Sequence, residues 1–493
     1  MVKGITILII GGMLCVTSYA TAQNINVLAN NVQRQLNSED AQYRQDYFRE
    51  TPISERLLLD AGGTFRYAYN MIQNSQSQSQ YLTTPDVRLF LRAELDGGIR
   101  FFGRLRFLYN EWDTNGSRDL APDAKEQGWQ NPIGEIYWAE FDLAGFTKSQ
   151  NGSLPPEFNL VIKGGRNYLI WGQGLVLSNY MYAVKAELTV GDLMVEGIFA
   201  QTAGQDTVDW DTSRPGYDTD TSRVYSGMKL NWNGIPGQKP YVYALWQEDQ
   251  NGGQQNIIGT VPTTFNYNNG YAGFGSTGSL GADLVYRTEF AYEFGLTLSD
   301  SLDPNSGSLS QPQQETRISA EAGLAGLTYL LRNEVDTRVD LSVLVGSGDK
   351  NRLDSGTTFG GIAPNHTDHS FNSLGYINTG FALAPDPANL LCPSAGISTD
   401  LLPDPSSWAR DLRLGITGFL FMKVDNQAPI NILTRPGGSN LIGGEVDATL
   451  DWRITSDINF NMRYGIFMPN SSVFFENQGA NRQFFYVGMT YAF

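Results

Sequence analysis

Cysteine, histidine and basic side chains are scarce in this chain of 493 residues, and each scarcity narrows the kinds of protein that it can be. The two cysteines are Cys15 and Cys392, and Cys15 lies in a predicted leader, so we expect no internal disulfide in the rest of the chain. Lys and Arg together number 34 against 51 Asp and Glu, which gives a formal net charge of -17. This acidity argues against a nucleic-acid partner.

Long apolar runs are also missing. Beyond the leader there is no stretch of about 18 consecutive apolar residues, so we expect no membrane-spanning helix. What the chain has instead is 41% hydrophobic residues, 12% aromatic residues and 53 glycines, distributed along its whole length. A soluble chain of this length would usually divide into two or three domains, whereas one large β-barrel would use the same length in a single wall.

The final eleven residues, 483–493, show the pattern that favours the barrel. Every second residue is apolar or aromatic, and the residues between are smaller and more polar on average; the first set is Phe485, Val487, Met489, Tyr491 and Phe493. A tilted membrane strand needs roughly 9–11 residues to cross the hydrocarbon, and its alternate side chains face lipid. An edge strand of a soluble sheet is the alternative interpretation of this segment alone.

The same alternation recurs from residue 57 onwards in about sixteen segments, with two less regular ones near Asn256 and Phe371. Short turns such as Gly97-Gly98 alternate with long loops rich in Gly, Asn, Asp and Pro. Bacterial barrels have even strand numbers, short periplasmic turns and long extracellular loops. The sequence therefore predicts an all-β, transmembrane, antiparallel up-and-down barrel of 18 strands, with 16 as the alternative.

The N-terminal residues have the features of a secretory signal. Lys3 precedes an apolar core from Ile5 to Val16, and Ala20-Thr21-Ala22 fits a cleavage site, so residues 1–22 are a predicted signal peptide. Residues 23–55 are polar and form a predicted periplasmic lead-in that is partly disordered. Residues 56–493 are the predicted barrel, which we expect to be a monomer in the bacterial outer membrane, in contact with lipid and lipopolysaccharide.

Several short segments resemble the alginate-export family of outer-membrane barrels. They are residues 163–175, residues 344–349 with the Ser-Gly-Asp end, residues 358–366 followed by Leu374-Gly375, residues 443–447 and residues 464–469. The resemblance implies an 18-stranded monomeric barrel that exports an anionic polysaccharide through a basic lumen, with periplasmic export components as further partners. The family's type members line the lumen with Arg and Lys, whereas inward positions here also carry acids such as Glu94, Asp96, Glu289 and Glu445.

Basic residues cluster on the inward face of the first five segments. We call this set the basic wall: Arg66, Arg88, Arg92, Arg100, Arg104, Arg106, Lys163 and Arg166. Guanidinium groups bind carboxylates through paired N–H donors, and rings of Arg and Lys give pores a preference for anions. One interpretation is that the wall binds and conducts anionic solutes. The other is that these residues pair with lumenal acids and stiffen the barrel.

Metal and catalytic sites are not predicted. The only histidines, His366 and His369, lie close together in a loop that offers no third ligand. The acidic loop of Asp206, Asp209, Asp211, Asp218 and Asp220 lacks the spacing of a known calcium site, and calcium binding there stays open. A barrel hydrolase would need a nucleophile beside a base, and no such motif occurs, so we expect neither an enzyme nor a cofactor.

The sequence thus favours a passive outer-membrane channel for an anionic polysaccharide or for smaller anionic solutes. The alternative is a general porin for small polar solutes. A third class is a receptor or anchor whose lumen is plugged by residues 248–281 or 350–404, which are long enough to fold inward.

Overall fold

A computed structural model provides the fold and describes most of the chain from residue 57 to its end. The described residues are 57–95, 97–113, 128–151, 158–204, 207–211, 214, 216–251, 253–258, 261–301, 312–352, 361–402, 411–430, 434, 437–475 and 479–493. The predicted signal peptide and lead-in therefore lie outside the described residues, as do Asp96 and Asp206. No helix among the residues described is long and apolar enough to span a membrane.

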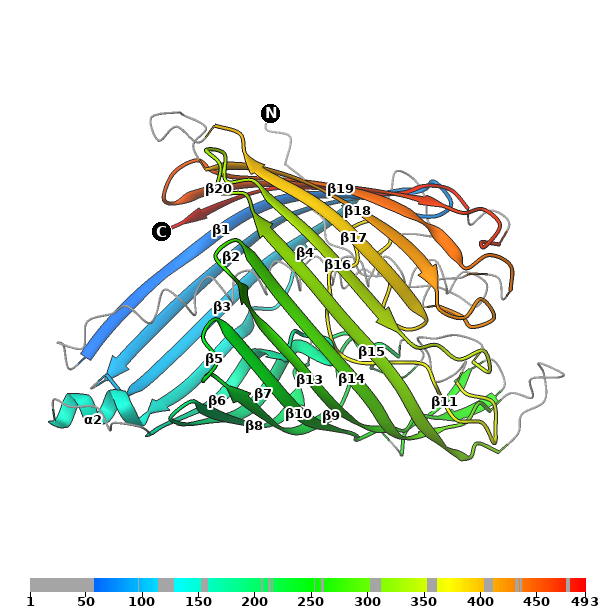
Figure 1. Ribbon diagram of the computed structural model, residues 1–493, viewed down its shortest axis with the longest axis horizontal. Helices are drawn as coiled ribbons and strands as arrows, with labels where there is room; N and C mark the ends of the chain where they lie inside the picture. Colours follow the sequence, from blue (N-terminus) through cyan, green and yellow to red (C-terminus); the bar gives the residue numbers. More distant parts are fainter. Residues whose placement is uncertain are drawn as a thin grey trace.

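Eighteen antiparallel strands form one closed barrel (Figure 1). They are β1 (Leu57–Gln73), β2 (Ser79–Leu95), β3 (Ile99–Asp113), β5 (Ile133–Asp142), β6 (Phe158–Trp171), β7 (Leu177–Val190), β8 (Leu193–Thr202), β9 (Arg223–Trp232), β10 (Gln238–Asp249), β13 (Tyr267–Leu280), β14 (Leu284–Leu298), β15 (Glu315–Leu330), β16 (Arg338–Gly346), β17 (Leu390–Asp400), β18 (Leu412–Lys423), β19 (Leu441–Arg453), β20 (Ile458–Pro469) and β21 (Arg482–Ala492). Each strand pairs with the next strand of the wall, and β21 closes the barrel by pairing with β1.

The predicted strand number of 18 is confirmed, but the two less regular segments were interpreted wrongly. Asn256 belongs to β11 (Gln255–Ile258), which pairs with β12 (Val261–Thr264) in a separate two-stranded sheet. Phe371 is buried in a segment that belongs to no strand. Alternation alone cannot exclude such segments, because a buried irregular segment also mixes apolar and polar residues.

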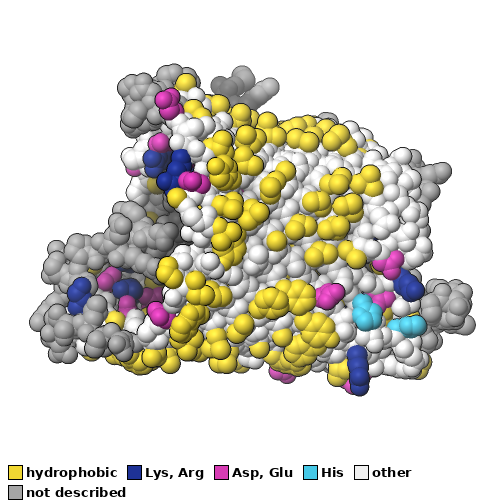
Figure 2. Space-filling view, viewed as in Figure 1, with side chains coloured by type: hydrophobic (Ala, Val, Ile, Leu, Met, Phe, Trp, Pro, Cys, Tyr) yellow, Lys and Arg dark blue, Asp and Glu magenta, His cyan; other side chains and the backbone are white. Residues whose placement is uncertain are grey.

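The two faces of the wall are as the alternation predicts. Leu89 and Leu105 are exposed on the outer face, whereas Arg88 and Arg104 on the same strands are buried on the inner face. Figure 2 shows hydrophobic side chains spread across the outer surface of the strands, with charged groups towards the ends of the barrel. An outer face of this kind suits lipid, and an inner face that carries charge suits a polar lumen.

The two ends of the barrel differ. At one end the strands join through tight connections such as Gly191-Asp192, and the other end carries β11 and the longer connections (Figure 1). The tight end also carries α2 (Leu143–Asn151), a helix between β5 and β6 that the sequence did not predict. The short strand β4 (Gly128–Trp129) pairs with β3 at the opposite end.

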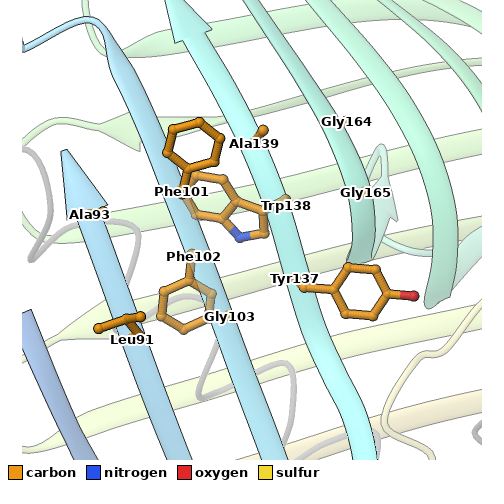
Figure 3. Close-up of a pocket in the computed structure, with 10 residues that line it drawn as sticks. All are labelled: Leu91, Ala93, Phe101, Phe102, Gly103, Tyr137, Trp138, Ala139, Gly164 and Gly165. Carbon is orange, nitrogen blue, oxygen red and sulfur yellow. The ribbon is translucent and has the colours of Figure 1, made fainter. Parts of the chain in front are cut away.

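One region of the wall is hollowed on its outer face (Figure 3). The hollow has a volume of about 380 Å³, and its lining is almost wholly apolar. It is lined by Leu91, Ala93, Phe101, Phe102, Gly103, Tyr137, Trp138, Ala139, Gly164 and Gly165. Small residues on adjacent strands leave this space because they carry no side chain long enough to fill it.

Candidate functional site: the constricted lumen

Residues 361–389, which connect β16 to β17, fold into the barrel instead of projecting from it, and we call them the inner segment (Figure 1, yellow). Its middle runs beside the start of β7: the Ser178 N–H donates to the Leu374 carbonyl oxygen at 2.9 Å. The Tyr376 N–H donates to the Gly174 carbonyl oxygen at 2.8 Å. The inner segment is therefore joined to a wall hairpin that is far away in sequence.

That hairpin consists of the end of β6 and the start of β7, residues 167–180. It also extends into the barrel, and we call it the inner hairpin. β5 pairs with β6 only as far as the Tyr137–Arg166 pair, so the rest of β6 is held by β7 alone. The Trp171 ring lies 6.3 Å from the Tyr243 ring of β10, and the Lys229 Nζ of β9 lies 4.8 Å from the Trp171 ring. The inner hairpin thus reaches across to strands that it does not pair with.

Gly165 marks the point where β6 leaves the wall. Its φ is +140°, and a Cβ at this position would lie 2.2 Å from the Tyr137 carbonyl oxygen. Arg166, the next residue, donates from Nε to the Glu135 carbonyl oxygen at 3.2 Å and from Nη1 to the Tyr182 hydroxyl at 3.2 Å. These contacts hold the bend, and the role of Arg166 as a pore-lining residue of the basic wall stays a prediction. A glycine pair inside a strand was the sequence signal for this bend.

Acidic residues of the wall hold the inner segment through its main chain. The Glu445 carboxylate on β19 accepts hydrogen bonds from the N–H groups of Phe381, Ala382 and Leu383, at 2.6, 2.7 and 2.8 Å. The neighbouring Asp447 accepts from the Phe381 N–H at 3.1 Å. Three neighbouring N–H groups donate to the one Glu445 carboxyl group, so residues 381–383 are firmly bound.

Acidic residues of β14 repeat the arrangement. Glu293 on β14 accepts a hydrogen bond from the Asn372 N–H at 2.9 Å, and Glu289 on the same strand accepts one from the Gln173 N–H of the inner hairpin at 2.7 Å. The Tyr271 hydroxyl of β13 donates to the Asn372 carbonyl oxygen at 2.6 Å. The inner segment is therefore fastened to β14 through Asn372 and to β19 through residues 381–383.

Apolar packing adds to these anchors. Phe371, Leu374 and Phe381 of the inner segment are buried, and the Phe381 ring lies 6.0 Å from the Phe484 ring of β21. The Phe371 ring lies 6.0 Å from the Tyr271 ring. Polar and apolar contacts together make the inner segment and inner hairpin a fixed constriction of the lumen.

The two ranges that were expected to be able to plug the lumen, residues 248–281 and 350–404, behave differently. Of the described part of residues 350–404, the inner segment lies inside the barrel and residues 390–400 form the wall strand β17. Residues 248–281 supply β11, β12 and the wall strand β13 instead. The sequence had suggested that each range is a single long loop, and the structure shows that neither is.

The upper part of the basic wall consists of arginines paired with two acids. Arg88 lies 3.1 Å from Asp86 and 3.4 Å from Glu135, measured between Nη2 and a carboxylate oxygen. The Arg104 Nε lies 2.6 Å from Glu135, and the Arg106 Nε lies 3.1 Å from Asp86. All five side chains are buried, so these pairs are shielded from bulk water.

The lower part of the wall, nearer the tight end, is paired in the same way. Arg92 bonds Glu94 at 2.8 Å, and Arg100 bonds Glu140 at 2.9 Å. The Lys163 Nζ lies 3.6 Å from Glu140. At the seam of the barrel, the Arg66 Nε donates to the Thr490 hydroxyl at 3.3 Å. The structure thus brings seven of the predicted residues to one wall, mostly in ion pairs.

Asp86 and Glu135 are lumenal residues that the sequence analysis missed. Glu135 lies at a β-bulge, because β3 pairs with β5 through Arg104–Ile136 and then Leu105–Gly134. The extra residue in the bulge points Glu135 towards the arginines, which a strict alternation places out of reach. The Tyr180 hydroxyl of the inner hairpin also donates to Glu135, at 3.3 Å.

The candidate metal ligands have other roles or stay exposed. His366 and His369 are both exposed, and the described part of the chain contains no group of three His, Cys, Asp or Glu residues that could hold a metal. Asp209 binds Arg214 at 3.1 Å and Arg223 at 2.6 Å. Burial alone would raise the pKa of Asp209, but these two guanidinium groups outweigh burial and hold that pKa below its ordinary value.

Solved structures similar to this chain are outer-membrane porins. OccK8 (OprE) of Pseudomonas aeruginosa is 9% identical, with a TM-score of 0.53 over 88% of this chain and 98% of that one. OccAB4 of Acinetobacter baumannii is 11% identical, with a TM-score of 0.54 over 90% of this chain and 100% of that one. Pseudomonas aeruginosa OpdK, solved with vanillate, is 11% identical, with a TM-score of 0.52 over 88% and 98%.

At such low identity this likeness establishes the porin-like barrel fold and nothing finer. No family model matches the chain, and no curated protein matches it in sequence. The expected membership of the alginate-export family is therefore not confirmed, whereas the broader expectation of a porin-like outer-membrane barrel is.

Proposed function

We propose that this protein is a passive outer-membrane channel for small polar solutes, with a preference for anionic ones. The observation that carries the proposal is a closed barrel whose lumen is narrowed by the inner segment and inner hairpin beside a wall with more basic than acidic groups. Arg66, Arg88, Arg92, Arg100, Arg104, Arg106 and Lys163 all belong to this wall. Diffusion past it needs neither a cofactor nor catalysis, and a monomer suffices.

Small solutes suit this lumen better than a polymer does. The inner segment is bonded to Glu293 through Asn372 and to Glu445 through Phe381, so it is held inside the lumen instead of hanging freely in it. OpdK was solved with vanillate, a small carboxylate, which supports small anions as cargo of such a fold. Export of an anionic polysaccharide remains a second candidate, favoured by the basic residues on five consecutive wall strands.

Ion selectivity in a planar bilayer tests the proposal. Under a salt gradient, the wild-type reversal potential should show a preference for chloride over potassium. Replacing Arg92 and Arg104 together by Gln should reduce this preference, because both lie on the inner wall. Arg453→Gln is the control, since its side chain is 63% exposed and pairs with Asp411 at the end of β19.

Three results separate the alternatives. Absence of any conductance would overturn the channel proposal, and a cation-selective wild type would overturn the anion preference. Long blocks of the current by polyuronate oligomers, lost in the Arg92/Arg104 double variant, would favour the polysaccharide over small solutes.

A further inference from the structure

The hollow on the outer face lies within the part of the wall that meets lipid (Figure 3). Leu91, Phe101 and Tyr137 line it with large side chains, which are 56%, 50% and 45% exposed. Exposed apolar and aromatic side chains on the outer face of a barrel belong to the band that contacts the hydrocarbon of the membrane. The hollow is therefore continuous with the lipid-facing surface.

Small residues give the hollow its depth. In the cross-strand register Gly103 lies between Leu91 of β2 and Tyr137 of β5, and a Cβ at Gly103 would meet no atom within 4 Å. Ala139 of β5 and Gly164 of β6 form the next pair on this face towards the tight end. Because directly opposite residues share a face of the sheet, these small residues open one connected slot across β3, β5 and β6.

The size and lining of the hollow fit a hydrocarbon chain. Its volume of about 380 Å³ is within the range of roughly 300–1,000 Å³ that is usual for small-ligand sites. The lining is almost wholly apolar, so it offers a polar ligand little to bind. An acyl chain is the apolar group that the outer face of a membrane barrel meets at this depth.

The hollow lies close to the tight end of the barrel. At this end β3 begins at Ile99 and β5 ends at Asp142, so Gly103 and Ala139 are four and three residues from the ends of their strands. A strand rises about 3.3 Å per residue, which places the hollow roughly 10–13 Å from the strand ends, measured along the strands. The hydrocarbon core is about 30 Å thick, so the hollow opens to the leaflet on the side of the tight end. Short turns mark the periplasmic side of bacterial barrels, and the periplasmic leaflet of the outer membrane consists of phospholipids.

Helix α2 places a cation at the same end. Its Phe146 ring lies 5.9 Å from the ring of Phe141, which is two residues after Ala139 on β5. Lys148 of α2 is exposed and forms no ion pair with any residue that the structure describes. A lysine at a membrane surface attracts the phosphates of lipid head groups. An apolar slot and, beyond it, an available ammonium group are the two features that a phospholipid requires of a binding site.

We propose that the hollow binds one acyl chain of a phospholipid from the periplasmic leaflet, and that Lys148 binds the phosphate of its head group. The site goes beyond the proposed channel function and does not depend on it, because the hollow is on the outer face of the wall. A lipid held in this slot stays with the barrel in mild detergent, whereas lipids on the convex parts of the wall exchange. It also fills the outer side of the wall beside the bend at Gly165.

Native mass spectrometry of the detergent-solubilised protein with added phosphatidylglycerol tests the site. Wild-type protein should retain one molecule of this lipid. Gly103→Leu should weaken the retention by more than about tenfold, because the new side chain has room to fold into the slot and then occupies it. Lys148→Gln should weaken it roughly fivefold, which is the usual effect of one lysine at a membrane surface.

Gly197→Leu and Lys350→Gln are the matched controls. Gly197 of β8 is opposite the exposed Met228, so it also lies on the outer face, and a Cβ there would meet only the Gly227 carbonyl oxygen, at 4.0 Å. Lys350 is an exposed lysine that follows β16 at the other end of the barrel. Both variants should retain the lipid as wild type does. The circular dichroism of every variant should match that of wild type, so that a loss of lipid is not a loss of fold.

Four results would overturn the site or its assignment. Equal retention in wild type and Gly103→Leu would overturn the site, as would a wild-type protein that retains no lipid. Retention of lipid A in place of phosphatidylglycerol, lost in Gly103→Leu, would overturn the assignment to the periplasmic leaflet. A lipid-free dimer that Gly103→Leu abolishes would assign the hollow to a second copy of the chain. None of these results depends on conductance, so the channel function is tested separately.

Discussion

Replacing Glu445 by Ala should loosen the constriction without opening the barrel wall. The substitution removes the acceptor of the Phe381, Ala382 and Leu383 N–H groups, and Asp447 can still accept only from the first of them. Hydrogen bonds to a charged group contribute about 1.5–3 kcal/mol each, but the released N–H groups regain water in a polar lumen. We therefore expect the free energy that binds residues 381–383 to the wall to fall by roughly 3 kcal/mol.

A loss of that size makes the detached state more than about a hundredfold more populated. The attachments at Glu293 and Tyr271 remain, and the segment still continues into β17, so residues 381–383 should become mobile while the rest of the inner segment stays in the lumen. Single-channel recordings should show a larger mean conductance and more current noise than in wild type. Hydrogen exchange of the amides of residues 381–383 should be faster, while that of the wall strands stays unchanged.

Asp451→Ala is the matched control for charge. Asp451 is on the same strand and faces the lumen, but its partner is Arg463 of β20, at 2.7 Å. This variant loses one negative charge and should keep the wild-type noise and the slow exchange of the inner segment. If Glu445→Ala behaved like Asp451→Ala in both measurements, the carboxylate would not be what holds the constriction, and the reasoning would be wrong.

Three further substitutions test the wall, the bend and a loop. Glu135→Gln removes a negative charge from beside Arg88 and Arg104, so the reversal potential should shift towards stronger anion preference; a shift towards cations would contradict this. Gly165→Ala should cost about 2 kcal/mol or more, because its φ is +140° and the new Cβ would clash with a carbonyl oxygen; an unchanged urea midpoint would contradict this cost. Asp209 has a lowered pKa in the folded chain, so the stability that it contributes is present above its ordinary value of 3.8 and is lost as the pH falls further. Protease resistance of residues 207–222 should therefore fall at acid pH in wild type, and Asp209→Asn should be less resistant at neutral pH with a flatter pH dependence; identical profiles would contradict this.

The wall was predictable because its rule is local. Lipid on one side and water on the other impose a period of two, and Leu89 and Arg88 obey it whatever the rest of the chain does. With an even number of up-and-down strands, the last strand, β21, runs antiparallel to β1 and can pair with it, so closure of the barrel also follows. The rule fails where the strand itself departs from regular geometry, as at the bulge of Glu135 and the bend of Gly165.

The constriction was not predictable from the same rule. The inner segment has no strand period, and its binding depends on main-chain N–H groups, which leave no trace in the sequence. Its anchors, Glu293 and Glu445, are visible as acids on inward positions, but nothing local distinguishes an acid that binds a solute from one that binds a loop. That distinction needed the spatial proximity of residues about 60 to 80 positions apart.

The acidity of the chain then has a physical explanation that does not oppose an anion-preferring pore. Glu289, Glu293 and Glu445 direct their charge at backbone N–H groups of the inner hairpin and inner segment, and Asp86 and Glu135 direct theirs at arginines. A carboxylate bonded in this way has its charge largely compensated by its partners, so it contributes less to the field that a solute meets than its formal charge implies. The formal net charge of -17 is therefore a poor guide to the potential along the basic wall, where the local balance of Arg92, Arg100 and Lys163 against their partners decides the sign.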